Sequence, residues 1–345
     1  MIEIISGPCS AETEDQVLAT AAALNGMALP GSGMRLRAFR AGLWKPRTRP
    51  GTFEGVGEAG IPWLQRVRDE LHLPVAVEVA TPAHLEAVLK ADLDMIWIGA
   101  RTVTNPFALQ ELAEVLRGVD IPVFIKNPMN PDPDLWMGAI ERIANAGVRD
   151  ISAVHRGFSF YEKGRYRNAP KWQVPMEVMK SMPQVPMYCD PSHISGNRAY
   201  IQEISQRALE LGFQGLFIES HVAPEKALSD SGQQVTPEQL QQLLASLTVR
   251  QSSSQDAEVL SQIESLRSRI DRIDEELLDV LAARMEVSAQ IGECKKRGNM
   301  QVLQQPRWNT VLQNVLALAR ERGLDEDTVR EIYTAIHQES ISRQL

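Results

Sequence analysis

The chain has 345 residues, of which 43% are hydrophobic and 23% are charged, and its formal net charge is -8 at pH 7. This length and composition are typical of a globular protein with one large and one small domain. The acidic balance argues against a nucleic-acid-binding protein, and no apolar run is long enough to predict a membrane span.

Three widely spaced cysteines, Cys9, Cys189 and Cys294, do not make a disulfide framework. Free thiols are typical of a reducing compartment. The first residues, MIEIISGPCS, lack the basic region and apolar core of a signal peptide. We therefore expect a cytoplasmic protein.

Short apolar runs rich in β-branched residues recur through the first 247 residues. Between most of them, apolar residues three and four apart predict amphipathic helices, as in 82–93 and 199–211. The predicted strands are 2–5, 35–39, 75–79, 95–98, 123–125, 150–154, 187–189 and 215–218. Eight strands alternating with helices predict a (β/α)8 TIM barrel. A doubly wound open sheet is the alternative, but the Gly-rich phosphate loop typical of that fold does not follow the first strand.

Catalytic groups of such a barrel lie just after the carboxyl ends of its strands. Five cationic side chains occupy such places: Arg40, Lys45, Arg101, Lys126 and Arg156. Positive charges that converge on one mouth repel one another unless an anion binds there. Guanidinium groups bind phosphate and carboxylate with two hydrogen bonds each, so we expect a site for one of these anions.

A thiol, an imidazole and two carboxylates also follow predicted strands. Cys9 comes after the first strand, and His193 lies in the polar loop expected after the seventh strand breaks at Asp190. Glu219 and Asp230 follow the eighth strand. Mixed sulfur, nitrogen and oxygen ligands suit a borderline divalent transition metal better than Mg²⁺ alone. The alternatives are a buried apolar cysteine and a capping aspartate beside a surface histidine.

The last hundred residues have a different sequence pattern from the first 247. Residues 248–257 are polar and Ser-rich, which predicts a flexible linker. A heptad-like apolar seam follows, formed by Val259, Ile263, Leu266, Ile270, Ile273, Leu277 and Val280. This seam predicts a long helix that packs along another helix. The next seam position is Arg284, and Lys295 shares its face, whereas Arg267 lies about a quarter turn away. From these residues alone, a dimerisation helix with charges at its edge is the alternative to a binding site.

Seven motifs in the first 245 residues carry a family resemblance. They are GPCS at Gly7, RAGLWKPRT from Arg40, IGAR from Ile98, IKNP from Ile125, HRG from His155, DPSH from Asp190, and FIESH with ALSD from Phe217. In this order they resemble the 3-deoxy-D-arabino-heptulosonate 7-phosphate (DAHP) synthases of the compact type I-beta class. The resemblance implies a condensation of phosphoenolpyruvate with erythrose 4-phosphate, assisted by a divalent ion such as Mn²⁺.

The resemblance also implies roles for single residues. The implied metal ligands are Cys9, His193, Glu219 and Asp230. Phosphoenolpyruvate is expected at Arg101, Lys126 and Arg156, with Arg40 and Lys45 nearby. The sugar phosphate is expected at Pro46, Arg47 and Thr48. Lys126 and Lys45 are the expected catalytic groups, Lys126 as proton donor or charge stabiliser. The related octulosonate-phosphate synthases carry Lys-Ala-Asn-Arg-Ser at the position of Lys45-Pro-Arg-Thr48, which favours the four-carbon aldehyde here.

The segment from Leu266 to Lys295 resembles the first helix of the all-helical, AroQ-type chorismate mutases. The resemblance implies that chorismate rearranges to prephenate at Arg267, Arg284, Lys295, Arg307, Ser340 and Gln344. Among these, Arg284, Lys295 and Gln344 are the expected catalytic residues. In that family two chains intertwine and the first arginine enters the partner's site. Gln304 and Trp308 depart from the family, where Asp and Glu are common and the Glu meets the substrate's hydroxyl.

Together these patterns predict a bifunctional shikimate-pathway enzyme. We expect a DAHP synthase barrel over 1–247, a linker over 248–257 and a chorismate mutase domain over 258–345. The expected partners are phosphoenolpyruvate, erythrose 4-phosphate, chorismate and a second copy of the chain, which dimerises through the helical domain. Prephenate or chorismate bound to that domain is expected to inhibit the barrel. The alternative is an octulosonate-phosphate synthase barrel with a helical domain that serves only dimerisation or regulation.

Overall fold

The computed structural model describes residues 1–29, 31–45, 51–160, 164–251, 253 and 256–345. The chain divides into two compact units, Met1–Ser252 and Ser253–Leu345. Pro46, Arg47 and Thr48, predicted to bind the sugar phosphate, lie outside the described residues. Among the described residues, no helix is long and apolar enough to cross a membrane.

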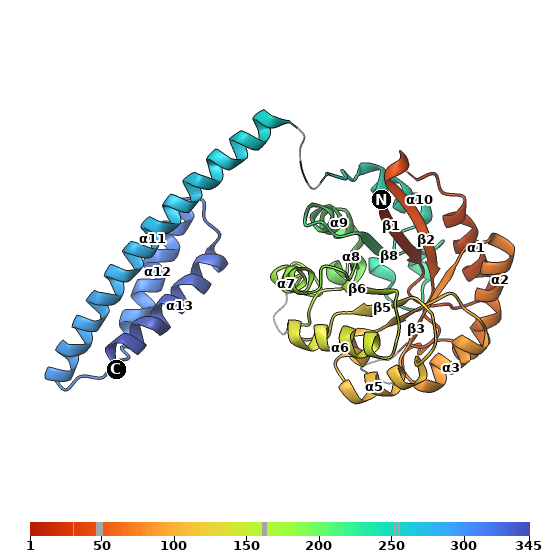
Figure 1. Ribbon diagram of the computed structural model, residues 1–345, viewed down its shortest axis with the longest axis horizontal. Coiled ribbons are helices and arrows are strands. Elements are labelled where there is room, and N and C mark those ends of the chain that lie inside the picture. Colours follow the sequence, from red (N-terminus) through yellow and green to blue (C-terminus); the bar gives the residue numbers. More distant parts are fainter. Residues whose placement is uncertain (30, 46–50, 161–163, 252, 254–255) are drawn as a thin grey trace. The chain divides into compact units, whose positions relative to one another are not determined.

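The first unit is a closed barrel of eight parallel strands in chain order, and β8 pairs with β1 (Figure 1). The strands are β1 (Ile2–Gly7), β2 (Met34–Arg40), β3 (Val75–Val79), β4 (Met95–Ile98), β5 (Val123–Lys126), β6 (Ile151–His155), β7 (Met187–Cys189) and β8 (Gly215–Glu219). The predicted barrel is confirmed, and each strand boundary lies within two residues of its prediction. Strands β3 to β8 are buried along their whole length, as a parallel barrel with both faces covered requires, whereas β1 and β2 are partly exposed near their amino-terminal ends.

Most of the helices of this unit cover the outside of the barrel (Figure 1). The helices are α1 (Glu14–Asn25), α2 (Ile61–Leu71), α3 (Pro82–Lys90), α4 (Ala100–Val103), α5 (Pro106–Val115), α6 (Pro133–Asn145), α7 (Gln173–Ser181), α8 (Pro191–Ser195), α9 (Ile201–Glu210) and α10 (Pro237–Ser246). Several begin in the same way: a Thr, Asn or Asp side chain accepts a first-turn N–H, and a proline follows it, as at Thr81, Asn105 and Asp132. Such caps end the preceding loop and fix where each helix starts.

Aromatic side chains fill the barrel interior. Trp97, Phe124 and Phe217 belong to a buried inner cluster and meet edge to face or tilted. The guanidinium carbon of Arg40 lies 4.7 Å from the Trp97 ring centre, and Nζ of Lys126 lies 5.1 Å from that of Phe217. The negative faces of these rings stabilise the two cations. The interior is therefore an aromatic floor beneath the charged mouth.

The second unit has three helices, α11 (Ala257–Arg297), α12 (Gln305–Glu321) and α13 (Glu326–Gln344). Both α11 and α12 pack against α13. The contact with α11 is close at Gly292, where a Cβ atom would lie 2.7 Å from the Cα of Gln344. A side chain at this position would push the two helices apart, so only glycine fits here.

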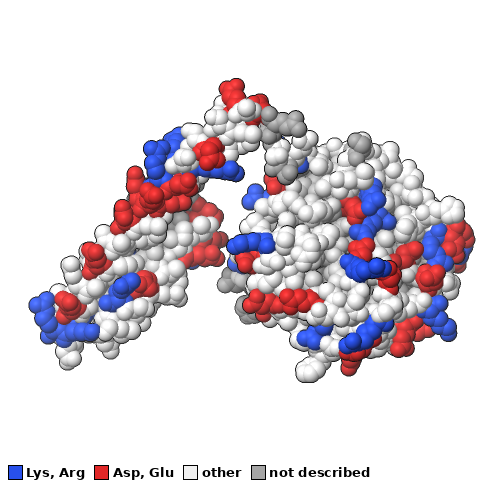
Figure 2. Space-filling model, viewed as in Figure 1, with Lys and Arg blue, Asp and Glu red and all other residues white. Residues whose placement is uncertain are grey.

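The predicted seam of α11 is largely uncovered within one chain. Its residues from Val259 to Val280 are 39–65% exposed, and the buried residues of α11 are Ser288 and Gly292, both nearer its C-terminal end. Acidic side chains gather over the same stretch of α11 in the view of Figure 2. Apolar and charged side chains interleaved at helical spacing are the pattern of a helix that buries one face. Among the described residues, no helix of the same chain covers the seam from Val259 to Val280.

Candidate active sites

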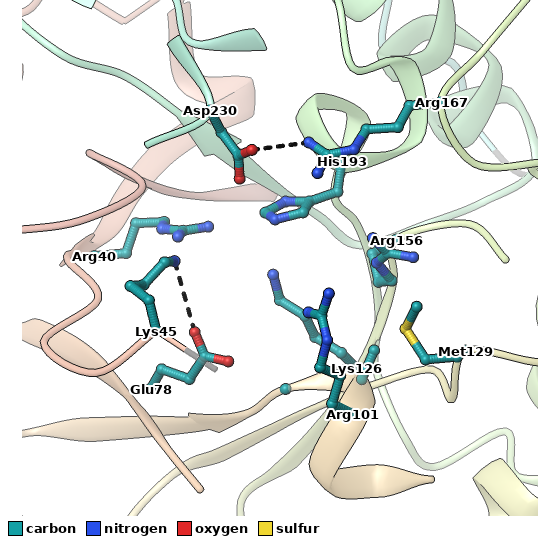
Figure 3. Close-up of a pocket in the computed structure, with 12 residues that line it drawn as sticks. Arg40, Lys45, Glu78, Arg101, Lys126, Met129, Arg156, Arg167, His193 and Asp230 are labelled. Atoms are coloured by element: carbon teal, nitrogen blue, oxygen red, sulfur yellow. Dashed lines mark hydrogen bonds and ion pairs between the residues drawn. The ribbon is translucent and has the colours of Figure 1, made fainter. Parts of the chain in front are cut away.

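One pocket lies at the carboxyl ends of the barrel strands (Figure 3). It is lined by Arg40, Lys45, Glu78, Gly99, Ala100, Arg101, Lys126, Met129, Arg156, Arg167, His193 and Asp230. All five cations predicted to converge do line this pocket, which we call the barrel mouth. Their amino and guanidinium groups point into a common space in Figure 3.

Two of these cations are buried, so the stability of their charged form depends on the groups around them. Lys126 ends β5, and its Nζ donates to Oδ2 of Asp190 at 2.7 Å. Burial lowers the pKa of Lys126, although Asp190 opposes the shift. Arg156 follows β6 and donates to Oδ1 of Asn168 at 3.0 Å, and burial lowers its pKa to about 10. Both groups would hold their charge more firmly with an anion bound beside them.

Arg40 ends β2 and is fully buried. Its Nη2 lies 3.2 Å from Oε1 of Glu219, whereas Nε and Nη1 have no hydrogen-bond partner among the described residues. A buried guanidinium with unused donors is costly. A ligand with acceptor oxygens in the mouth would remove that cost.

A carboxylate that sequence reasoning did not assign to the site faces Lys45. Nζ of Lys45 donates to the Cys9 carbonyl at 2.9 Å and lies 3.8 Å from Oε2 of Glu78. A Cβ atom on Gly99 would meet Oε1 of Glu78 at 2.2 Å, so Gly99 leaves the space that this carboxylate occupies. The available signal was a charged residue inside β3, whose residues are otherwise apolar.

The four predicted metal ligands gather at one side of the mouth. One ligand atom each of Cys9, Glu219 and Asp230 lies within 4.8 Å of the others. His193 is outside that tight group, with Nδ1 2.8 Å from Oδ2 of Asp190 and 3.8 Å from Oε1 of Glu219. It lies beside Asp230 in Figure 3. The structure therefore brings three ligands together and places the fourth at their edge.

The electrostatics of this group fit a divalent cation. Burial and the neighbouring Glu219 raise the pKa of the Cys9 thiol to about 12. Burial opposes ionisation of Asp230, but His193 and Arg167 outweigh it and hold the pKa of Asp230 below its usual range. A buried thiol beside two carboxylates ionises readily only when a cation is bound to it. The donor set of one thiol, one imidazole and two carboxylates suits a borderline transition ion.

Two residues that sequence reasoning missed hold the carboxylate ligands. Nη1 of Arg167 donates to Oδ1 of Asp230 at 2.9 Å and to Oε1 of Gln233 at 2.8 Å. Nε2 of Gln233 in turn donates to Oε2 of Glu219 at 2.7 Å. Such outer partners fix the orientation of metal ligands. No sequence signal separates these two polar side chains from ordinary surface residues.

The DPSH motif combines a capping role with a site role. The predicted polar loop after β7 is instead the short helix α8, because Asp190 caps it and Pro191 occupies its first turn. Oδ1 of Asp190 accepts from the His193 N–H at 3.0 Å, and Oδ2 accepts from Lys126. Asp190 thus fixes both a predicted ligand and a predicted catalytic lysine. The prediction of a loop was wrong, whereas the capping aspartate is confirmed.

A second pocket lies within the helical unit. It is lined by Arg284, Ser288, Ile291, Lys295, Val302, Gln304, Arg307, Trp308, Val311, His337, Ser340, Ile341 and Gln344. Nη1 of Arg284 donates to Oγ of Ser340 at 2.5 Å, and Nζ of Lys295 donates to Oε1 of Gln344 at 2.7 Å. Five of the six residues expected here therefore line one pocket, which we call the helical pocket.

Arg267 does not line the helical pocket. It is exposed on α11, and its nearest acidic partner is Glu264 of the same helix at 3.8 Å. Its predicted position on a different face from Arg284 agrees with this placement.

One wall of the helical pocket is an aromatic pair. Trp308 on α12 stacks on His337 on α13, with ring centres 4.0 Å apart and an angle of 7° between the rings. Burial and the cations Arg284 and Lys295 lower the pKa of His337. Sequence reasoning singled out Trp308 as a departure from its family and missed His337.

Comparison with known proteins divides the chain in the same way. Residues 1–255 match the DAHP synthetase I family, and residues 266–345 match chorismate mutase type II. The chain is 31% identical over 241 residues to phospho-2-dehydro-3-deoxyheptonate aldolase of Thermotoga maritima, covering 70% of this chain and 67% of that protein. It is 28% identical over 257 residues to 2-dehydro-3-deoxyphosphooctonate aldolase of Desulfotalea psychrophila, covering 71% of this chain and 88% of that protein.

Solved structures agree. The crystal structure of the DAHP synthase from Thermotoga maritima superposes with a TM-score of 0.61 at 30% identity, covering 70% of this chain and 67% of that chain. A truncated form of the synthase from the same organism gives a TM-score of 0.58 at 28% identity, covering 70% and 84% of the two chains.

Proposed function

The chain belongs to the DAHP synthetase I family and carries a chorismate mutase type II domain, so it is a bifunctional shikimate-pathway enzyme, and we propose that its barrel condenses phosphoenolpyruvate with erythrose 4-phosphate. The observation that carries this proposal is the barrel mouth, where a cluster of cations, among them the buried Arg40 with unused donors, lies beside a thiol, an imidazole and two carboxylates. That arrangement suits a substrate with both a phosphate and a carboxylate.

The charged groups of the barrel mouth indicate a role for each residue in the condensation. Arg101, Lys126 and Arg156 bind the phosphate and carboxylate of phosphoenolpyruvate, with Arg40 beneath them on the aromatic floor. Carbon 3 attacks the aldehyde carbon of the sugar, positive charge develops at carbon 2, water adds there, and phosphate leaves. Lys126, whose pKa is lowered by burial, would either donate a proton to the oxyanion that forms from the aldehyde oxygen or stabilise the charge of that oxyanion. Asp190 keeps its ammonium group aimed at the reacting atoms.

Cys9, His193, Glu219 and Asp230 would hold a divalent cation, which supplies Lewis acidity at the aldehyde oxygen or positions a water when bound. The chain's own part is to prepare this ligand set. Asp190 fixes the backbone N–H of His193.

A two-substrate assay with chelator treatment tests the barrel reaction. We expect synthase activity to disappear with the metal and to return with Mn²⁺ or a similar ion, whereas chorismate turnover persists. Arabinose 5-phosphate should be a poor substitute for erythrose 4-phosphate. Full activity of metal-free protein, or a preference for the five-carbon aldehyde, contradicts the proposal and favours an octulosonate-phosphate synthase.

For the helical unit we propose the rearrangement of chorismate to prephenate, which needs no acid or base. Arg284, together with Arg267 of a second copy, would bind the two carboxylates of chorismate, and Arg307 and Ser340 would complete the pocket. Lys295 and Gln344, already hydrogen-bonded to each other, would stabilise negative charge on the ether oxygen. We expect Arg284→Ala to lower mutase kcat by about 10²-fold, the scale for one preorganised electrostatic group, with the synthase unchanged. Unaltered turnover would mean that the helical unit is structural.

We also propose that two copies assemble through α11. The exposed seam from Val259 to Val280 would be covered by the second copy, and Arg267 of each chain would complete the other chain's helical pocket. Ile273→Asp should give a monomer in analytical ultracentrifugation and abolish mutase activity. A monomeric wild-type protein with full mutase activity would contradict this assembly.

A further inference from the structure

His337 lines the helical pocket, and the proposed reaction assigns no role to it. It shares one face of α13 with Ser340 and Gln344, because spacings of three and four bring helix residues together. Its imidazole lies flat on Trp308 of α12, and both side chains are half-buried. The stack restricts the ring to one plane, so its nitrogens point along a fixed edge.

The helical pocket is rich in donors and poor in acceptors. Chorismate offers two carboxylates, which suit the cations, and also a ring hydroxyl whose proton needs an acceptor. Oε1 of Gln344 already accepts from Lys295. Oγ of Ser340 accepts from Arg284 and donates to the Ile336 carbonyl. Among the described lining residues none is Asp or Glu.

Apart from the Ser288 hydroxyl, which carries a proton of its own to donate, two lining side chains remain that could accept the hydroxyl proton, His337 and Gln304. Gln304 is exposed and makes no capping hydrogen bond at the start of α12. His337 is half-buried, and its imidazole nitrogens have no hydrogen-bond partner in the part of the chain that the structure describes. An acceptor that is already held in place binds more favourably than one that must first be ordered.

We infer that His337 is a specificity-determining residue of the mutase, which accepts the hydrogen bond of the chorismate ring hydroxyl while Trp308 holds its ring in place. This inference rests on the proposed mutase function. The lowered pKa of His337 keeps the imidazole neutral at pH 7, so that one nitrogen retains its lone pair. A protonated imidazole would have two donors and no acceptor.

Two variants of the full-length protein test separately the hydrogen-bond acceptor of His337 and its stacked ring. His337→Phe keeps a flat ring for Trp308 to stack on and removes the lone pair. We expect its mutase kcat/KM to fall about tenfold, mainly through KM, as for the loss of one hydrogen bond to a neutral group. His337→Asn loses the stack and keeps an acceptor, so it should recover most of the lost kcat/KM. The synthase activity of each variant serves as an internal control for the protein preparation.

The pH profile provides a readout that a merely structural role would not change. As the pH falls below the usual histidine value of about 6.5, protonation should remove the acceptor and lower the wild-type kcat/KM. That step should be missing in His337→Phe. The charged groups that act on His337 are Arg284 and Lys295 on α11, and Arg307 on α12 lines the same pocket.

The possible outcomes distinguish a failure of this inference from a failure of the proposed mutase function. If wild-type protein turns over chorismate and His337→Phe matches it in kcat/KM and in pH profile, the inference is overturned and the mutase function stands. A loss that appears in Gln304→Ala and not in His337→Phe overturns it equally, because Gln304 is then the acceptor. If wild-type protein does not turn over chorismate, the proposed function fails and the inference fails with it.

Discussion

Arg167 differs from the other cations of the barrel mouth in what it contacts. Its two side-chain hydrogen bonds go to Asp230 and Gln233, and Gln233 in turn donates a hydrogen bond to Glu219. The guanidinium therefore belongs to the group that arranges metal ligands, although it also lines the mouth. Removing it would leave Asp230 free to rotate away from Cys9 and Glu219.

We predict that Arg167→Ala weakens metal binding about 10- to 100-fold, the range for removing an outer partner of a metal ligand. Titration of metal-free protein with Mn²⁺, followed by calorimetry, measures this directly. Arg165→Ala is the matched control, because Arg165 pairs with Glu203 on the surface and does not line the mouth. Unchanged metal affinity with a raised KM for a substrate would show that Arg167 binds a substrate instead.

At the scale of elements, a charged cluster ties together strands at the amino-terminal end of the barrel. Glu3 of β1 accepts hydrogen bonds from Arg35 and Arg37 of β2 and from the Tyr188 hydroxyl of β7. Arg37 also donates to Asp150, just before β6. Burial opposes ionisation of Glu3, but its donors outweigh it and lower the pKa of Glu3. One carboxylate thus joins three strands that are distant in sequence.

We predict that Glu3→Gln destabilises the barrel by about 1–2 kcal/mol at pH 7, because it removes the charged partner of the half-buried Arg37. A lowered folded pKa stabilises the protein above the unfolded value and loses that effect as the pH falls through the folded pKa. The difference between variant and wild type should therefore shrink below about pH 4. Urea unfolding followed by tryptophan fluorescence measures this, since five of the six tryptophans lie in the barrel.

Glu203→Gln provides the control for that experiment, because Glu203 forms an exposed pair with Arg165 and should change the unfolding midpoint little. A difference between Glu3→Gln and wild type that stays constant as the pH falls from 7 to well below 4 would show that the carboxylate charge of Glu3 is not responsible.

The strands and the cations could be predicted from sequence for the same physical reason. Parallel strands buried on both faces read as short apolar runs, and their carboxyl ends all meet at one mouth. A residue such as Lys126 or Arg156 is therefore placed once its strand is known. The prediction failed after β7, where a local capping interaction determined the structure: Asp190 caps the short helix α8 in a segment that was expected to be a loop.

The outer partners of the site could not be predicted, because they depend on contacts between distant segments. Gln233 reaches Glu219 across a loop, and Arg167 reaches Asp230 from 63 positions away in the chain. Neither lies at a strand end or on a periodic face. His337 was missed for a related reason, since its role depends on its contact with Trp308 from another helix.

At the scale of the whole molecule, two enzymes of one pathway occupy one chain. The two compact units are Met1–Ser252 and Ser253–Leu345, and the sequence between α10 and α11 is polar and Ser-rich. A short tether keeps the units at high effective concentration whatever their mutual arrangement. Under the proposed mutase function, the helical pocket would also hold prephenate, which lies downstream of the proposed product of the barrel. Binding there can alter the barrel if the ligand favours one arrangement of the two units over another.

We predict on this basis that prephenate inhibits the synthase through the helical pocket. Such coupling is typically about 1–3 kcal/mol, which corresponds to roughly 5- to 150-fold in affinity or inhibition. The synthase rate against prephenate concentration should fall for the full chain. It should not respond in a chain truncated after Val249, which keeps the pairing of Thr248 with Gln206 at the end of the barrel unit.

Arg284→Ala in the full chain separates ligand binding from the mere presence of the helical unit, because it removes a cation from the pocket and leaves both units in place. We expect this variant to lose inhibition by prephenate and to keep its synthase rate. Linkage also requires the reverse effect: phosphoenolpyruvate bound in the barrel must change the affinity of the helical pocket for prephenate by the same factor. Calorimetry with and without phosphoenolpyruvate measures it. If the full chain and the truncated chain respond alike to prephenate, or if neither responds, the helical unit is not the sensor.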